Sequence, residues 1–157
     1  MISKPTTPQL IDAVCAELAN EVAPVLDGPR RVVLDMAIGV LRAAAVRCAT
    51  EISWMNEEAA AIEALGRQLA AEIPDSADLA AALADYDDAR TANVLLADVQ
   101  SAYECAGEVL SCAIEAAYRT GRSDHIAAVT DLVRERVAHQ NVVTGTFEAV
   151  GRSATSS

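Results

Sequence analysis

Apolar residues recur along most of this chain at intervals of three and four, the spacing of one face of an α-helix. Proline and glycine interrupt the pattern at only a few points. The first predicted helix follows Thr6-Thr7-Pro8, a hydroxyl cap before a proline that suits a first turn, and it ends at Pro24. Its expected apolar face comprises Leu10, Ile11, Val14, Leu18 and Val22.

The chain restarts at Asp27-Gly28-Pro29, and the pattern predicts a second helix from about Pro29 to Glu51. Its expected buried stripe comprises Val33, Met36, Ala37, Val40, Leu41, Ala44 and Cys48. The segment Ser53-Trp54-Met55-Asn56 looks like a break, because Asn56-Glu57-Glu58 resembles a cap with acidic first-turn residues. A third predicted helix then carries Ile62, Leu65, Leu69 and Ile73, and it ends at Pro74.

The longest predicted helix runs from about Arg90 to Tyr118, after a shorter helix that Ser76 caps and that carries Leu79 and Leu83. It would be about 45 Å long if continuous. Its apolar face comprises Leu95, Val99, Ala102, Ala106, Val109 and Ala113, widened by Leu96, Tyr103, Leu110 and Ala117. Gly121 should end it, and Ser123 should cap a last helix that carries Ile126, Val129, Val133 and Val137.

These elements predict an all-α, single-domain helical bundle of about five to six helices, one of them long. We expect the bundle to occupy residues 1–150 and residues 151–157 to form a disordered tail. A length of 157 residues fits one domain. Hydrophobic residues make up 52% but aromatic residues only 3%, so Ala, Val, Leu and Ile must build the core. Alanine favours helices that approach one another closely.

The charge balance narrows the choice of partners. The chain has 23 acidic and 12 basic side chains, a net charge of −11. Phosphate backbones and anionic lipid surfaces would repel it on average, so we expect neither nucleic acid nor membrane as a partner. The sequence lacks the pattern of a secretory signal and any long apolar run. No cysteine belongs to a C-x-x-C motif, so reduced thiols in a cytoplasmic protein are expected.

No specific catalytic or cofactor signature is present, and we expect neither a cofactor nor a metal. Glu104, Glu108 and Glu115 share a helix face, but di-iron bundles also need Glu-x-x-His pairs. Neither His125 nor His139 has a glutamate three residues before it, so a solvated acidic face is the favoured interpretation.

Two further groups receive structural interpretations. Cys105 and Cys112 are two helical turns apart, too far for one metal ion or one disulfide, and we expect core thiols. The acidic cluster Asp85-Tyr86-Asp87-Asp88 lacks the glycine and the distant glutamate of a calcium loop, which favours a solvated acidic patch.

Two local features are candidate binding residues. Arg30 and Arg31 lie at a predicted helix N-terminus, where free backbone N–H groups and two guanidinium groups would hold an anion. Ion pairing with acidic residues of the preceding helix is the favoured alternative. Trp54 is the single tryptophan. It would plug the end of a core or, if exposed, anchor an interface.

The opening of the chain resembles a family of small helical bacterial proteins. These proteins have no established activity and are commonly encoded beside aminoglycoside-phosphotransferase-like kinases and acyl-CoA dehydrogenases. The resemblance rests on Pro5-Thr6, Leu10, Ala13-Val14, Leu18, Glu21-Val22, Pro24, Leu26, Gly28, Ala37 and Leu41, with a weaker likeness at 134–138. The family's second helix is expected to carry Arg and Asn four residues apart, where this chain has Asp35 and Gly39. The resemblance implies acyl-CoA or hydroxyacyl metabolism and a kinase-like partner.

Three functions remain open from the sequence. The first is a non-catalytic accessory protein that self-associates or docks on a phosphotransferase-like enzyme. The alternative is a helical bundle that binds a small acyl or anionic ligand, and a weaker third is an enzyme that uses Glu104 and Glu108. We expect a homodimer, because the flanking helices look too short to cover the helix at 90–118, unless that helix breaks near Gly107. The expected interface residues are Trp54, Val99, Tyr103 and Val109.

Overall fold

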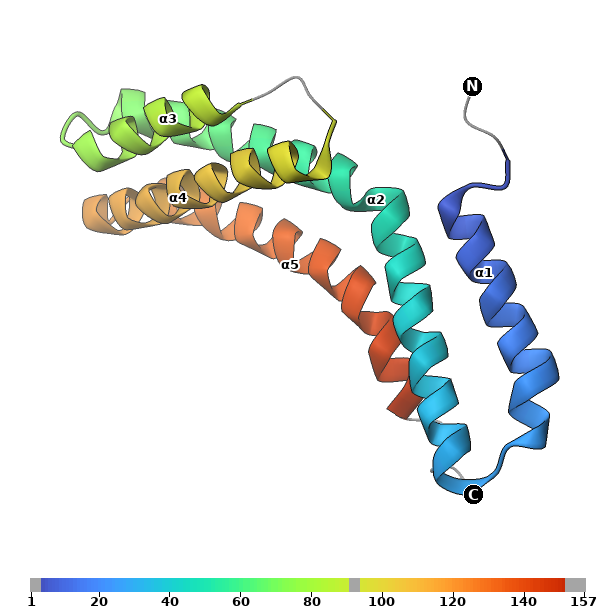
Figure 1. Ribbon diagram of the computed structural model, residues 1–157. Coiled ribbons are helices and arrows are strands. Elements are labelled where there is room, and N and C mark those ends of the chain that lie inside the picture. Colours follow the sequence, from blue (N-terminus) through green and yellow to red (C-terminus); the bar gives the residue numbers. More distant parts are fainter. Residues whose placement is uncertain (1–3, 91–93, 152–157) are drawn as a thin grey trace. The chain divides into compact units, whose positions relative to one another are not determined.

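The computed structural model describes residues 4–90 and 94–151, with side chains described as far as residue 142. Its α-helices are α1 (Thr7–Glu17), α2 (Gly28–Glu72), α3 (Ala77–Ala89), α4 (Leu96–Thr120) and α5 (Ser123–Gly151), shown in order in Figure 1. A π-helical segment (Leu18–Val22) and a 3-10 turn (Ala23–Val25) follow α1. The predicted all-α bundle of about five to six helices, one of them long, is confirmed.

The first helix begins as the sequence predicts. Thr6 is its N-cap, and Pro8 lies in the first turn. The side-chain oxygen of Gln9 accepts the Thr6 backbone N–H at 2.9 Å, which satisfies one of the donors that a helix start leaves unpaired. The helix gives way to the π-helical segment and then to the 3-10 turn, which contains Pro24.

The longest helix is α2, not the helix predicted at residues 90–118. It runs for 45 residues without the break expected at residues 53–56. The Ser53 hydroxyl donates to the Glu57 carboxylate at 2.7 Å, one turn further along the same helix. The predicted cap residues therefore lie in a helix interior. Serine, asparagine and glutamate cost well under about 1 kcal/mol each in that position, so these residues do not stop the helix.

The boundaries of α3 and α4 agree with the sequence more closely. Ser76 precedes α3, and its buried hydroxyl donates to the Ile73 carbonyl at 2.6 Å rather than to a backbone N–H of α3. Helix α3 continues through the acidic cluster at 85–88, where Tyr86 is buried and the three aspartates are exposed. Helix α4 begins at Leu96, later than predicted, and passes Gly107 without a break.

The turn between α4 and α5 has two residues. Gly121 adopts φ +67°, a left-handed conformation that glycine enters without the steric cost of a side chain. It ends α4 as predicted. Ser123 is already helical, and the Arg122 carbonyl accepts the first bond of α5 at 3.1 Å, so the predicted cap is one residue off. Gly151, predicted to begin the tail, is the last residue of α5; residues 152–157 lie outside the described part of the chain.

The chain divides into two compact units. The first comprises residues 1–51 and 139–157, and the second comprises residues 52–138. Helices α2 and α5 each contribute to both units.

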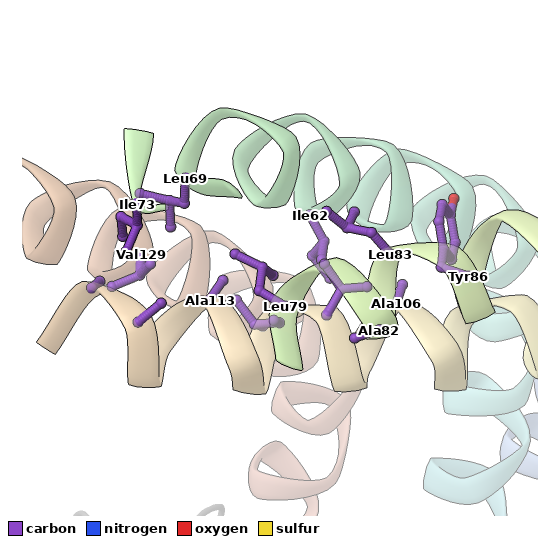
Figure 2. Packing of buried hydrophobic residues seen from close by; sticks show 14 of the residues in the cluster. Ile62, Leu69, Ile73, Leu79, Ala82, Leu83, Tyr86, Ala106, Ala113 and Val129 are labelled. Atoms are coloured by element: carbon purple, nitrogen blue, oxygen red, sulfur yellow. The ribbon is translucent and has the colours of Figure 1, made fainter. Parts of the chain in front are cut away.

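The second unit is a four-helix bundle built from residues 52–72 of α2, from α3 and α4, and from residues 123–138 of α5. Side chains from these helices meet in one apolar core (Figure 2). Its buried members are Ala59, Ile62, Leu69, Ile73, Leu79, Ala82, Leu83, Tyr86, Ala106, Val109, Leu110, Ala113, Ala116, Ala117 and Val129. The apolar stripes predicted for residues 62–73, 79–83 and 99–117 are thus largely confirmed, whereas Leu95, Leu96, Val133 and Val137 are exposed.

One contact shows how tightly this core is packed. A Cβ atom built on Gly66 of α2 would lie 2.7 Å from Cγ1 of Val109 on α4, closer than two carbon atoms normally approach. The absence of a side chain at position 66 therefore lets α2 and α4 come together. Small residues at helix contacts have this effect generally, and the alanine-rich composition supplies many of them.

In the first unit, α1 lies antiparallel to the first half of α2, and we call residues 7–51 the α1–α2 hairpin. The Cys15 thiol of α1 lies 3.9 Å from the Ile38 carbonyl oxygen of α2. The buried apolar side chains of the hairpin are small apart from one isoleucine: Cys15, Ala23, Ile38, Ala43 and Ala45.

Candidate functional site

The predicted interface on α4 is wrong for its two valines. Val99 and Val109 are 3% and 0% exposed and lie among the chain's own helices. The premise that α4 needs a second copy to cover its apolar face therefore fails. Because α2 extends to Glu72 and the bundle contains α3 and α5, these helices cover α4 although it does not break at Gly107.

Of the fifteen large apolar side chains exposed in the described residues, eight lie on the α1–α2 hairpin; the others lie at residues 94–96, at Tyr118 and on α5. Val33, Met36 and Val40, predicted to be buried, are 66%, 59% and 52% exposed. Leu10 and Val14 of α1 are likewise about half exposed. The complete set on residues 10–40 comprises Leu10, Val14, Val22, Val25, Val32, Val33, Met36 and Val40. We call these eight side chains the hairpin surface.

The buried stripe predicted for the second helix is wrong at Val33, Met36 and Val40, for a physical reason. Helical spacing shows which side chains share a face, but it does not show whether another element covers that face. In residues 28–51 of α2 the buried positions are instead Ile38, Gly39, Ala43 and Ala45, and Leu41 and Ala44 of the predicted stripe are half-buried. The largest predicted positions therefore remain in contact with solvent.

The charges of the hairpin are separated between its two arms. Residues 7–27 contain four acidic side chains and no basic one. Residues 28–51 contain four arginines and two acidic side chains. Glu17 and Glu21 follow Leu10 and Val14 at steps of three and four, so acidic and apolar residues share one side of the first arm.

The arginines predicted to bind an anion are both exposed, but they differ in their contacts. The Arg31 guanidinium donates to the Ala23 carbonyl at 3.0 Å and forms an ion pair with Asp35 at 2.9 Å. It therefore joins the end of the 3-10 turn to α2. Asp35 is not one of the acidic partners considered from the sequence, which all preceded Arg30. The anion site at Arg30 and Arg31 stays a prediction. Trp54, the other candidate, is half-buried on α2 in the second unit.

Two polar clusters occur within the second unit. In the first, Arg136 Nε donates to the Tyr103 hydroxyl at 2.8 Å, and that hydroxyl donates to Glu58 Oε2. The guanidinium carbon also lies 5.1 Å from the centre of the Tyr103 ring, within reach of a cation–π interaction. Burial, together with the hydrogen bond to Glu58, raises the pKa of Tyr103 and keeps its phenol neutral. Tyr103, predicted at an interface, therefore joins α2, α4 and α5 internally.

The second cluster surrounds His125, which is buried. Its Nε2 donates to Glu72 Oε2 at 2.9 Å, and its Nδ1 lies 3.4 Å from the Thr120 hydroxyl. The hydrogen bond from His125 lowers the pKa of Glu72, assisted by a second bond from Gln68. Arg122 lies 3.5 Å from the same carboxylate. The cluster fastens the start of α5 to the ends of α2 and α4.

The order hydroxyl, imidazole, carboxylate resembles the arrangement that activates a nucleophile, but the contact between Thr120 and His125 is long, at 3.4 Å. The Thr120 hydroxyl donates its proton to the Ala117 carbonyl at 2.8 Å, and it accepts the Arg122 backbone N–H at 3.3 Å. The Ala117 carbonyl is the nearer acceptor for this hydroxyl, since His125 Nδ1 lies 3.4 Å from it. The geometry therefore supports a fastening role for these groups.

Sequence reasoning missed both clusters, although a signal was available. Glu58 precedes Ile62 by four residues, and His125 precedes Val129 by four. Arg136 follows Val129 by seven. Each polar residue thus lies on the apolar stripe of its helix, where a polar side chain needs a partner. The identity of the partner could not be predicted, because it lies 33 to 53 positions away in the chain.

The remaining candidates show no assembled chemistry. Glu104, Glu108 and Glu115 are exposed, as a solvated acidic face requires. Each of the four cysteines is free; Cys15 is buried and Cys48 is exposed. Within residues 4–90 and 94–142, no three His, Cys, Asp or Glu side chains are grouped so as to hold a metal ion.

Comparison with known proteins assigns no relative. No protein-family model, no curated protein and no solved structure matches this chain. In the described part of the chain, none of the helices combines the length and apolarity needed to cross a bilayer.

Proposed function

We propose that this chain is a non-catalytic interaction protein that binds another protein through its hairpin surface. One observation carries the proposal: eight large aliphatic side chains are exposed on residues 10–40. Single exposed apolar residues are ordinary in soluble proteins, but a concentration of them on one short segment is typical of a protein-binding surface.

The packing of the polar clusters supports a non-catalytic role. The Tyr103 hydroxyl is held between Arg136 and Glu58, and His125 is held by Glu72. These contacts join helices to one another and leave the groups committed to the fold. A cytoplasmic accessory subunit fits this description. The family resemblance of the first helices adds a class of partner, a phosphotransferase-like enzyme of acyl-CoA or hydroxyacyl metabolism.

The alternative is a bundle that binds an acyl or other anionic ligand near Arg30 and Arg31. An anion at that site would compete with the Ala23 carbonyl and the Asp35 carboxylate for the Arg31 guanidinium. Breaking these contacts would offset part of the binding free energy. Protein docking on aliphatic side chains meets no such competition, and we therefore favour it.

Site-specific photo-crosslinking in the native host tests the proposal. A photo-reactive residue at Met36 is expected to form a covalent adduct with a protein, either a second copy or another chain. The matched control is Tyr118 of α4, which is exposed to the same extent, 60% against 59%, but lies outside the hairpin. Protein adducts at position 36 no more abundant than those at position 118 would overturn the proposal.

Native mass spectrometry of the purified chain distinguishes ligand binding from protein docking. A bound acyl or anionic molecule at one per chain, lost when Arg30 and Arg31 are both replaced by alanine, would favour ligand binding. Protein complexes without such a molecule are expected.

A further inference from the structure

We infer that the partner of the hairpin surface is an amphipathic helix of another protein, with lysine or arginine on its polar side. This inference rests on the proposed docking role of the surface and names the chemistry of the partner. Its support comes from the placement of the exposed apolar side chains on the two hairpin helices and from the charges beside them.

The exposed apolar side chains of the two helices lie on the same side of the hairpin. Leu10 lies five residues before Cys15, which is buried in α1. Val33 lies five residues before Ile38, which is buried in α2. Cys15 contacts Ile38 between antiparallel helices, and positions at equal steps from such a contact project to the same side of the pair. The two exposed rows therefore form one surface along the seam between α1 and α2.

This surface suits a helix better than other protein segments. An added strand needs unpaired backbone groups at a sheet edge, whereas the backbone of α1 and α2 is bonded within each helix. Proline-rich segments bind grooves lined with aromatic side chains, and residues 1–51 contain no aromatic residue. An amphipathic helix needs apolar ridges at helical spacing, and Val33, Met36 and Val40 supply them at steps of three and four.

The extent of the surface sets the length of the partner helix. The exposed apolar positions of the first arm run from Leu10 to Val22, twelve residues apart and therefore roughly 18 Å along the axis. A partner helix of about twelve residues covers this distance. A helix that short is only marginally stable in water on its own. The partner segment therefore belongs to a folded domain or becomes helical when it binds.

The charged side chains beside the apolar row of α1 are acidic. Glu17 follows Val14 by three residues and precedes Glu21 by four, so both glutamates continue the exposed row. In the described part of the chain, neither carboxylate forms an ion pair. Residues 7–27 contain no basic side chain to offset them. A bound helix therefore meets two uncompensated negative charges, which lysine or arginine would complement and acidic side chains would oppose.

The arginines of α2 explain why a second copy is a poorer partner than a basic helix from another protein. Arg31 and Arg47 are each paired with a carboxylate of the same helix. Arg42 lies two residues after Val40, which turns it by about 200° away from the exposed row. Of the four arginines on residues 28–51, Arg30 alone could then pair across an interface. A second copy would bring two glutamates for each such arginine.

Photo-crosslinking of charge variants in the native host tests the inference. A photo-reactive residue at Met36 reports the adduct with the partner in each chain. The test variant is Glu17→Lys/Glu21→Lys. The matched control is Glu104→Lys/Glu108→Lys on α4, which has the same spacing, exposure and change of charge. The adduct should decrease at least about fivefold in the test variant, because attraction becomes repulsion, and less than about twofold in the control. Equal adduct in the two variants would overturn the inference.

The sequence of the crosslinked peptide separates this inference from the proposed function. Mass spectrometry is expected to identify a segment of a different protein, with apolar residues at helical spacing and an excess of lysine and arginine. An adduct with a second copy, or with an acidic or non-helical segment, would overturn the inference and leave the docking role standing. Adducts at Met36 no more abundant than those at Tyr118 would overturn both.

Discussion

The α1–α2 hairpin and the four-helix second unit are built from the same aliphatic residue types at the same helical spacing, yet they bury them to different extents. In the second unit, Ile62, Leu69 and Val109 are almost completely removed from water. In the hairpin, Val33, Met36 and Val40 retain at least half of their exposed surface. The comparison shows that periodicity identifies a face, while the number of surrounding helices decides whether the face becomes a core.

The largest expected effect comes from a matched pair of leucines, one in each region. Leu69→Ala should lower the free energy of unfolding by about 2–5 kcal/mol, because a fully buried leucine leaves a cavity. Leu10→Ala should change it by less than about 0.5 kcal/mol in dilute solution. Chemical denaturation at low protein concentration measures both. Equal losses would mean that the hairpin is as well packed as the bundle.

A pair of glycines tests how tightly the second unit is packed. Gly66→Ala should destabilise by about 1–3 kcal/mol, because the new methyl group collides with Val109. Gly107→Ala should stabilise by about 0.5–1 kcal/mol, because nothing lies within 4 Å of the new methyl group and alanine favours helices. Thermal melting of both variants shows whether each substitution stabilises or destabilises the protein. Stabilisation by both would indicate a looser contact between α2 and α4.

A pair of tyrosines tests the buried polar cluster. Tyr103→Phe should cost about 1–2 kcal/mol, since Glu58 and Arg136 each lose a hydrogen-bond partner. Tyr118→Phe, at a position 60% exposed, should change the unfolding free energy very little. Urea titrations of the two variants compare them directly. If the free energy of unfolding were unchanged in Tyr103→Phe, water would be replacing the hydroxyl without loss of stability.

A smaller effect should appear as a dependence on pH. The hydrogen bond from His125 lowers the pKa of Glu72 below its ordinary value of 4.5 in the folded state. The carboxylate therefore contributes stability above about pH 4.5, and this contribution is lost as the pH falls through the lowered pKa. Glu72→Gln should reduce the loss of stability on acidification, measured by urea titration at a series of pH values. Glu115→Gln, which removes an exposed carboxylate, should leave the dependence of the unfolding free energy on pH as in the wild type. If this dependence were the same in all three proteins, the role of the His125 contact would be contradicted.

The smallest effect concerns thiol reactivity and leaves stability unchanged. Burial raises the pKa of Cys112, which lowers the fraction of reactive thiolate at neutral pH. Cys48 of the hairpin is exposed. A maleimide followed by peptide mass spectrometry should modify Cys48 first and Cys112 much later. The reverse order would argue against the burial described for these two residues.

The sequence allowed correct prediction of those helices whose apolar face is covered by other helices. The apolar face of α4 from Val99 onward and the end of that helix at Gly121 agree with the structure, whereas Leu95 and Leu96 are exposed. The continuity of α2 was missed, because Asn56 and the following glutamates are as compatible with a helix interior as with a cap. The local residue pattern does not distinguish a helix interior from a helix cap. Contacts with the rest of the chain determine which of the two forms.

The candidate surface could not be located from the sequence for a related reason. Val99 and Met36 have similar apolar neighbours along their helices, but one is buried and the other exposed. Their difference arises from chain segments far away in the sequence. What the sequence does contain is the division of charge between the two hairpin arms, which becomes informative once Cys15 and Ile38 are known to be adjacent.

The division into units has a consequence for the order in which the protein folds during synthesis. The second unit is continuous in the sequence, and two of its connections are short, so its contacts are local and should form quickly. The first unit combines residues 1–51 with residues from 139 onward. The segment that completes the first unit is therefore synthesised last, after every residue of the second unit. For that interval the aliphatic side chains of the hairpin lie in the nascent chain before their unit is whole, which is when chaperones would be expected to act on this protein.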